Sequence, residues 1–126
     1  MSPFASPERD VIARQIADGL DGYKATMEAW LATPGNLELY EKLSGQIESL
    51  RIMSSSALPR ATGALADLLL AHTDLTFIAL KKHLVRLDAL RPDADSGQLA
   101  KARERHEATL SDMRSLCVRS SGRHVA

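Results

Sequence analysis

The chain has 126 residues, of which 44% are hydrophobic and 25% charged, and its 16 basic residues balance its 16 acidic ones. This length fits one domain, and the composition is ordinary for a globular protein, which argues against wholesale disorder. A formal charge of zero argues against a nucleic-acid binder that relies on an overall basic field. We therefore expect one folded domain that does not bind nucleic acid.

The cysteine content and the N-terminal sequence indicate the cellular compartment in which the protein is expected. The single cysteine, Cys117, cannot form an internal disulfide, and a reducing cytoplasm is the simplest interpretation. The first ten residues lack the basic and apolar regions of a secretory signal. The longest apolar run, Leu68 to Ala71, is too short to span a bilayer. We expect a cytoplasmic protein without a membrane partner.

Apolar side chains recur at steps of three and four, which predicts an all-α fold. No Val/Ile/Thr-rich segment alternates with period two, so a sheet has little support. One helical domain over residues 1–126 is expected, with flexible termini and helices at about 7–32, 37–54, 58–91 and 96–119. Short connections favour antiparallel neighbours, so the predicted architecture is an antiparallel up-down four-helix bundle with a long third helix.

Three of these helices each have one apolar face. The inward positions are Ile12, Ile16, Leu20, Tyr23, Met27 and Trp30 in the first, Tyr40, Leu43, Ile47 and Leu50 in the second, and Leu99, Ala102, His106, Leu110, Met113 and Cys117 in the fourth. Asn36 can cap the second helix, and the serines at 54–56 are expected to end it. Gly19 and Gly22 either weaken the first helix or let a neighbouring helix approach closely.

The third helix carries more apolar surface than one partner can cover. One seam consists of Ala61, Leu65, Leu68, His72, Leu75 and Ala79, and a second of Leu69, Leu70, Phe77, Leu80, Leu84 and Leu87. Together they form a stripe wider than the usual one-sided face. Either two or three helices pack on this stripe, or part of it meets another chain.

Three histidines are the candidates for chemistry. His72 and His106 lie on apolar seams, whereas His83 follows His72 by eleven residues, roughly 16 Å of helical rise. Two histidines so far apart cannot share a metal, and the paired Glu-x-x-His pattern of helical di-metal sites is absent. Packing histidines are therefore favoured, and a metal- or small-molecule-binding bundle using His72 and His106 is the third hypothesis.

Other motifs predict no catalysis. The Asp93–Gly97 segment lacks the closing glutamate of a calcium loop and fits a helix cap better. Cys117 fits a small buried apolar residue. No phosphate-binding loop, nucleophile elbow, zinc-protease helix or kinase signature occurs. We expect no enzyme activity, no catalytic residue, no metal site and no cofactor.

The stretch from Trp30 to Leu70 resembles a degenerate histidine phosphotransfer domain. The resemblance lies in the loop Thr33-Pro34-Gly35-Asn36 and in the later Ile47-Glu48-Ser49-Leu50-Arg51. In that family the second helix carries His-x-Leu-Lys-Gly-Ser. Glu48 takes the histidine position and Arg51 the lysine position, while Ile52 and Met53 replace Gly-Ser. The resemblance therefore implies that phosphotransfer is lost, and that docking of a response-regulator receiver around Glu48 and Arg51 could survive.

The leading hypothesis is a non-enzymatic bundle that acts by binding protein. It rests on the surplus apolar surface of the third helix, because an exposed apolar patch marks an interaction site. The protein would act as an adaptor, chaperone or regulatory module, and its partner could be a second copy of itself. The candidate contact residues are Leu70, Phe77, Leu84 and Leu87.

Overall fold

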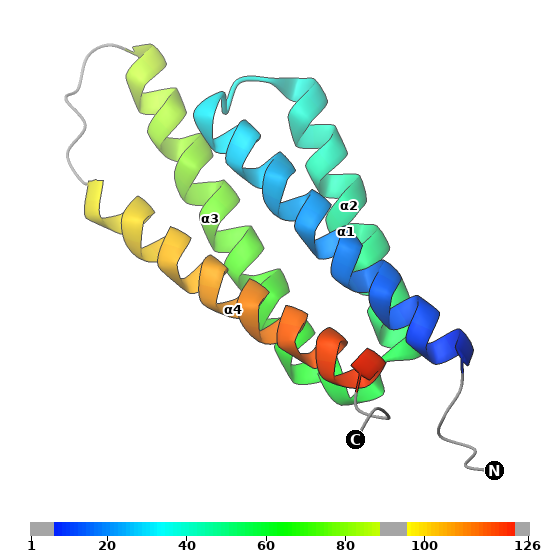
Figure 1. Cartoon of the computed structure of the whole chain (residues 1–126). Coiled ribbons are helices and arrows are strands. Elements are labelled where there is room, and N and C mark those ends of the chain that lie inside the picture. The colour runs from blue at the N-terminus through cyan, green and yellow to red at the C-terminus, as the bar shows by residue number, and fades with distance from the viewer. Residues whose placement is uncertain (1–6, 89–95, 123–126) are drawn as a thin grey trace.

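The computed structural model describes residues 7–88 and 96–122, which form four long helices and contain no strand. The elements are α1 (Pro7–Ala32), α2 (Leu37–Ala57), a short 3-10 turn η1 (Pro59–Ala61), α3 (Thr62–Asp88) and α4 (Ser96–Gly122). Each helix runs antiparallel to the one before it, and α1 begins at the end of the bundle where α4 finishes (Figure 1). The predicted all-α, up-down four-helix bundle is confirmed, and α3 is long, with 27 residues.

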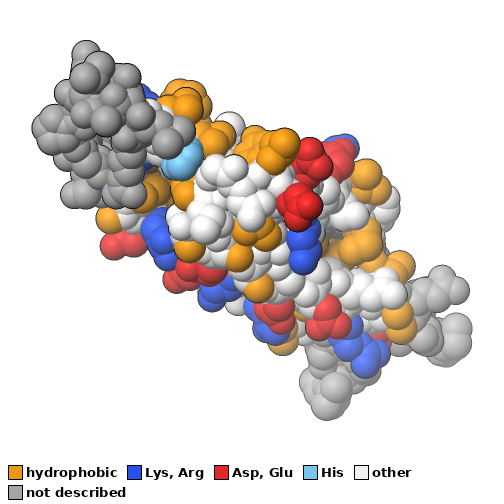
Figure 2. All heavy atoms as spheres, turned by 90° about the horizontal axis from the view of Figure 1, so that it is seen from above, with side chains coloured by type: hydrophobic (Ala, Val, Ile, Leu, Met, Phe, Trp, Pro, Cys, Tyr) orange, Lys and Arg blue, Asp and Glu red, His pale blue; other side chains and the backbone are white. Residues whose placement is uncertain are grey.

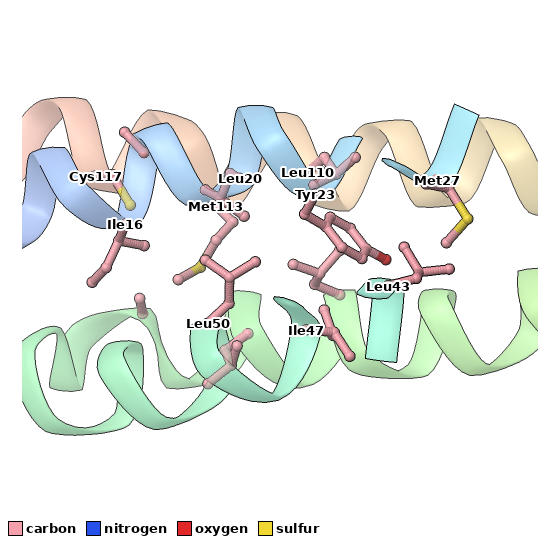
Figure 3. Packing of buried hydrophobic residues seen from close by; sticks show 14 of the residues in the cluster. Ile16, Leu20, Tyr23, Met27, Leu43, Ile47, Leu50, Leu110, Met113 and Cys117 are labelled. Atoms are coloured by element: carbon pink, nitrogen blue, oxygen red, sulfur yellow. The ribbon is translucent and has the colours of Figure 1, made fainter. Parts of the chain in front are cut away.

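The core forms from the predicted inward faces of the helices. Its most completely buried large side chains are Ile16, Leu20, Tyr23, Met27, Trp30, Leu43, Leu68, Leu75, Met113 and Cys117. Figure 3 shows these faces meeting in the middle of the bundle, with side chains of α1 and α4 opposite those of α2. Burial of such apolar side chains is the main favourable contribution to folding. The hydrophobic periodicity therefore placed the core correctly.

Three ion pairs fix the register of α1 against α4. The Arg114 guanidinium donates to both carboxylate oxygens of Asp21, at 2.9 and 3.0 Å. Arg103 donates to Glu28 at 3.0 Å. A third pair joins Lys24 to Glu107 at 3.6 Å. Each pair is exposed and adds little stability alone. Because residue numbers rise on α1 as they fall on α4, the pairs match only one antiparallel register.

The α1–α2 loop and the start of α2 follow the predicted pattern. The Asn36 side chain accepts a hydrogen bond from the Leu39 backbone N–H at 3.1 Å, which confirms it as the N-cap of α2. Behind this loop, the Trp30 ring packs against Tyr40 with ring centroids 5.6 Å apart. The loop also contacts α3, since a Cβ added at Gly35 would lie 3.0 Å from Nε2 of His83. This end of the bundle is thus closed by aromatic packing.

The predicted end of the second helix is wrong by one turn. Instead of breaking at the serines, α2 continues to Ala57, and Ser54 is buried against the core. The Leu58 N–H donates to the Ser54 carbonyl at 2.9 Å and completes that last turn. Leu58 precedes Pro59, and a residue before proline is forced out of the helical region. The proline therefore sets the boundary, and the hydroxyl side chains do not.

The third helix begins later than predicted. Residues Pro59–Ala61 form the 3-10 turn η1, and the α-helix starts at Thr62. The Thr62 hydroxyl donates to the Pro59 carbonyl at 2.7 Å, which joins the two pieces. From Thr62 to Asp88 the helix is continuous. The last predicted residues, 89–91, lie outside the described part of the chain, as do the Asp93–Gly97 cap residues up to Asp95.

Gly19 allows the close approach of α1 and α2. A Cβ at this position would lie 3.1 Å from Cδ2 of Leu50, a core side chain of α2. The same test at Gly22 gives an ordinary contact of 3.8 Å to Gln46. The close-approach interpretation therefore holds for Gly19, where a larger side chain would push against a buried leucine.

We predict that Gly19→Val lowers the free energy of unfolding by about 1 to 3 kcal/mol, because it overpacks the α1–α2 contact. The matched control is Gly45→Ala on α2, where an added Cβ meets nothing within 4 Å. The control should raise stability by about 0.5 to 1 kcal/mol through helix propensity alone. Urea unfolding followed by circular dichroism measures both, and equal stabilisation by the two variants would contradict the packing argument.

Candidate functional site

A tyrosine and two histidines meet inside the bundle and form what we call the tyrosine–histidine cluster: Tyr23, His72 and His106. The Tyr23 hydroxyl lies 2.7 Å from Nδ1 of His72 on α3 and 2.7 Å from Nε2 of His106 on α4. Tyr23 is fully buried and His106 is 3% exposed, whereas His72 is half-buried. The ring centroids of the two histidines lie 5.8 and 5.5 Å from that of Tyr23. One phenol thus joins three of the four helices.

Proton counting defines the state of this cluster. The Tyr23 hydroxyl has one proton, so it can donate to only one of the two facing ring nitrogens. For all three side chains to be hydrogen-bonded, the histidine that does not accept from Tyr23 must donate its own ring N–H to the phenolic oxygen. The facing nitrogens of His72 and His106 must therefore differ, one protonated and one bare. If both rings became cationic, both would donate, and the tyrosine proton would lose its acceptor.

The environment keeps the cluster uncharged. Burial lowers the pKa of His72 and, together with the nearby His72 and Arg103, lowers that of His106 to about 4. Burial likewise raises the pKa of Tyr23 far above its usual value. Charged forms of all three groups are disfavoured because they would lose their hydration in the core. The cluster is thus a neutral hydrogen-bonded network at pH 7.

We predict that Tyr23→Phe lowers the free energy of unfolding by about 1 to 3 kcal/mol, because it leaves two histidine nitrogens without their partner. Tyr40→Phe is the matched control, because the Tyr40 ring packs on Trp30 outside the cluster. The control should change stability by less than about 0.5 kcal/mol. Chemical denaturation at pH 7 gives both values, and similar losses in the two variants would show that the phenol contributes nothing.

The lowered histidine pKa values predict loss of stability in mild acid. The unfolded chain takes up protons near pH 6.5, whereas folded His106 does so only near pH 4. The unfolded state therefore binds more protons between these values, and stability falls as the pH falls. From pH 7 to pH 5 the free energy of unfolding should drop by about 1 to 2 kcal/mol.

His106→Gln is the control for this pH dependence, since glutamine can bond to Tyr23 without titrating. It should remove at least half of the drop between pH 7 and pH 5, as measured by urea unfolding at each pH. The exposed carboxylate of Asp21 does not contribute to this drop, because its hydrogen bond to Arg114 lowers its pKa and the group titrates in stronger acid. An unchanged drop in the variant would refute the assignment to His106.

The two histidines of the metal hypothesis, His72 and His106, lie together. His72 and His106 both reach Tyr23, while His83 lies against Gly35 in the α1–α2 loop. Within residues 7–88 and 96–122, no three or more His, Cys, Asp or Glu side chains gather in a metal-binding group. The facing nitrogens are also occupied by the phenol. This geometry fits a structural polar network better than a coordination site.

Cys117 is buried in the core, as its place on the inward face predicted. Burial raises the pKa of its thiol to about 11, with Arg114 acting in the opposite direction. A protonated, enclosed thiol is a poor nucleophile. This residue therefore has a packing role.

The second seam of α3 divides into covered and exposed positions. Leu69 and Leu80 are partly buried against the core. Leu70, Phe77 and Leu84 are 66%, 64% and 61% exposed. We call these three the α3 outer stripe. The side chain of the fourth candidate, Leu87, lies outside the described part of the structure.

Two further observations concern the apolar character of α3 and of one face of the molecule. The segment Pro59–Val85 is apolar and long enough to cross a bilayer by length and composition, a property shared with core helices of soluble proteins. Only 33% of its most apolar 18-residue window is buried inside the structure. Figure 2 shows hydrophobic side chains in separate patches on one face of the molecule, with acidic and basic side chains interleaved. Thus α3 carries large apolar side chains that the bundle leaves exposed.

The residues that carry the phosphotransfer resemblance lie on the outer side of α2. Glu48 and Arg51 are both exposed and form an ion pair within one helical turn. Their hydrogen bond lowers the pKa of Glu48. Ile52 follows on the same side, 53% exposed, while Leu50 points into the core. The structure brings no histidine to this surface among the residues it describes.

The chain has no significant match among protein-family models, curated proteins or solved structures.

Sequence reasoning missed the central member of the cluster. It placed all three on inward faces and paired His72 with His106 in the metal hypothesis, but it did not bring Tyr23 to them. The available signal was that all three are polar residues on otherwise apolar faces, and buried polar groups need partners. What the sequence could not supply was the relative height of the three helices.

Proposed function

We propose that this protein is a non-enzymatic helical bundle that acts by binding another protein through the α3 outer stripe. One observation carries the proposal: Leu70, Phe77 and Leu84 repeat every seven residues on one helix, and each is more than 60% exposed. A repeat of seven is the spacing of a helix that packs against another helix. Such a surface fits an adaptor, chaperone or regulatory module.

The distribution of polar and apolar groups supports this proposal. Within the described residues, the polar groups best placed for chemistry are enclosed, since Tyr23 and His106 are buried and bonded to each other. Large apolar groups meanwhile face solvent on α3. Leaving three such side chains exposed costs stability that burial would recover, about 1.5 to 3 kcal/mol for each full burial. Binding is the direct way to recover it.

The test is affinity capture with the full chain as bait. We predict that Phe77→Glu reduces captured partner at least tenfold, because a charge would have to be buried in an apolar interface. Ile52→Glu is the matched control, an apolar position 53% exposed on α2. It should leave capture within about twofold of the parent chain. Equal capture by the parent chain and Phe77→Glu would overturn the proposal.

A second candidate function is docking of a response-regulator receiver on α2. It is supported by the exposure of Glu48, Arg51 and Ile52 on one side of that helix, where the sequence resembles a degenerate phosphotransfer motif. The acceptor histidine position is occupied by Glu48, so docking would occur without phosphotransfer.

The two candidates predict opposite responses to the same variants. Receiver docking on α2 should be abolished by Arg51→Glu, which reverses a surface charge, and weakened by Ile52→Glu. It should be unaffected by Phe77→Glu. A pull-down with purified receiver domains measures this directly, and absence of binding by the parent chain would eliminate the second candidate.

A further inference from the structure

We infer that the occupant of the α3 outer stripe is the same stripe of a second copy, packed antiparallel about a two-fold axis at Phe77. This inference rests on the proposed function, because it names the partner of the same surface. Three features of α3 carry it: the spacing of its exposed apolar residues, the side on which its charges lie, and the order of those charges.

The spacing is symmetric about Phe77. Leu70 precedes it by seven residues and Leu84 follows it by seven. In an antiparallel pair centred there, Leu70 of one copy lies level with Leu84 of the other, and the two Phe77 rings meet at the axis. A seven-residue repeat drifts by about 20° per heptad on a straight helix, which a crossing angle of about 20° compensates. All three apolar residues can then stay in contact.

The flanking charges favour the antiparallel direction. Successive residues of an α-helix are about 100° apart around its axis. Asp74 and Lys81 therefore lie about 60° and about 40° around the axis from Phe77, both on the same side. In an antiparallel pair the two-fold axis is perpendicular to the plane that contains both helices. It therefore puts the charged side of one α3 next to the charged side of the other. Asp74 is three residues before the axis and Lys81 four after it, so their heights differ by about 1.5 Å across the interface. Each Asp74 therefore meets Lys81 of the second copy, twice per dimer.

A parallel pair lacks this complementarity. It would place the charged side of each α3 against the other side of the stripe, where Thr73 and Leu80 lie. Both charges would then face uncharged side chains. Asp74 also lies 3.6 Å from Arg105 on α4, an exposed contact that leaves 54% of the Asp74 side chain accessible. The antiparallel arrangement is thus the one that pairs both Asp74 and Lys81 with opposite charges while the three residues of the α3 outer stripe stay in contact.

The size of the surface predicts a weak dimer. A stable interface buries about 800 Å² per partner, and one helix face contributes less than that. The expected dissociation constant is therefore on the order of tens of micromolar. The subunits should exchange within the dead time of mixing and appear monomeric when dilute.

Cysteine crosslinking tests the direction of the pair. The variants are Leu70→Cys and Leu84→Cys, with Phe77 kept, and the parent chain is the blank because Cys117 is buried. An equal mixture of the two variants should form a disulfide-linked dimer under mild oxidation. Leu70→Cys alone should not, because two copies of residue 70 would lie about 21 Å apart. Crosslinking of Leu70→Cys to itself would establish a parallel pair and overturn the inference.

Sedimentation at increasing concentration tests the charge contacts. Asp74→Lys and Lys81→Asp should each raise the dissociation constant about tenfold, since each replaces two attractive contacts by two repulsive ones. The double variant should return to within about threefold of the parent chain. Because the double variant does not restore the contact with Arg105, recovery isolates the contact between copies. No recovery would refute the Asp74–Lys81 pairing.

The outcomes separate this inference from the proposed function. A parent chain that stays monomeric at several hundred micromolar and forms no mixed crosslink overturns the second copy as occupant. A dimer that persists in Phe77→Glu overturns it as well, because the interface would lie elsewhere. Neither result touches the capture experiment, in which a different protein could still depend on Phe77. Capture that does not depend on Phe77, in turn, would defeat binding of a different protein through the stripe, whether or not pure protein dimerised.

Discussion

The bundle depends on one buried hydroxyl. Tyr23 projects from α1 and bonds to a histidine on α3 and a histidine on α4. Figure 3 shows its ring among the core side chains, where water cannot supply replacement hydrogen bonds. The apolar contacts around it would tolerate small sliding of the helices, since burial has no direction. The 2.7 Å bonds do not, so this cluster selects one relative height for three helices.

The outer ion pairs agree with that choice. On the exposed side of α1, Asp21 meets Arg114 and Glu28 meets Arg103, both on α4. Sliding α4 by one turn would break these pairs together with the bond to His106. Each exposed pair is weak, but a set that matches only one register adds specificity. The polar side chains of α1, the buried Tyr23 and the exposed Asp21 and Glu28, thus determine the position of α4 along the bundle.

On α3, a polar side chain faces the core and large apolar side chains face solvent. Its inward face holds His72 beside small and apolar residues, and its outward face holds Leu70, Phe77 and Leu84. The half-buried His72 points inward and bonds to Tyr23, while apolar groups are left in solvent. Leu70, Phe77 and Leu84 are each more than 60% exposed, so they contribute little to the packing within one subunit. Their seven-residue spacing is the basis of the proposed docking surface.

The sequence by itself determined the helical class, the inward faces and the cap at Asn36, because these follow from local periodicity and side-chain chemistry. It misplaced the end of α2 because Ser54 could equally face solvent in a turn or the core in a helix, and only packing decides between them. It identified the surplus of apolar surface on α3 but not which of its leucines stay exposed. The tertiary structure alone decided that Leu69 and Leu80 are partly covered while Leu70 is not, and that Tyr23 meets both histidines. Such contacts join residues 49 and 83 positions apart, and their geometry depends on how whole helices slide and rotate against one another.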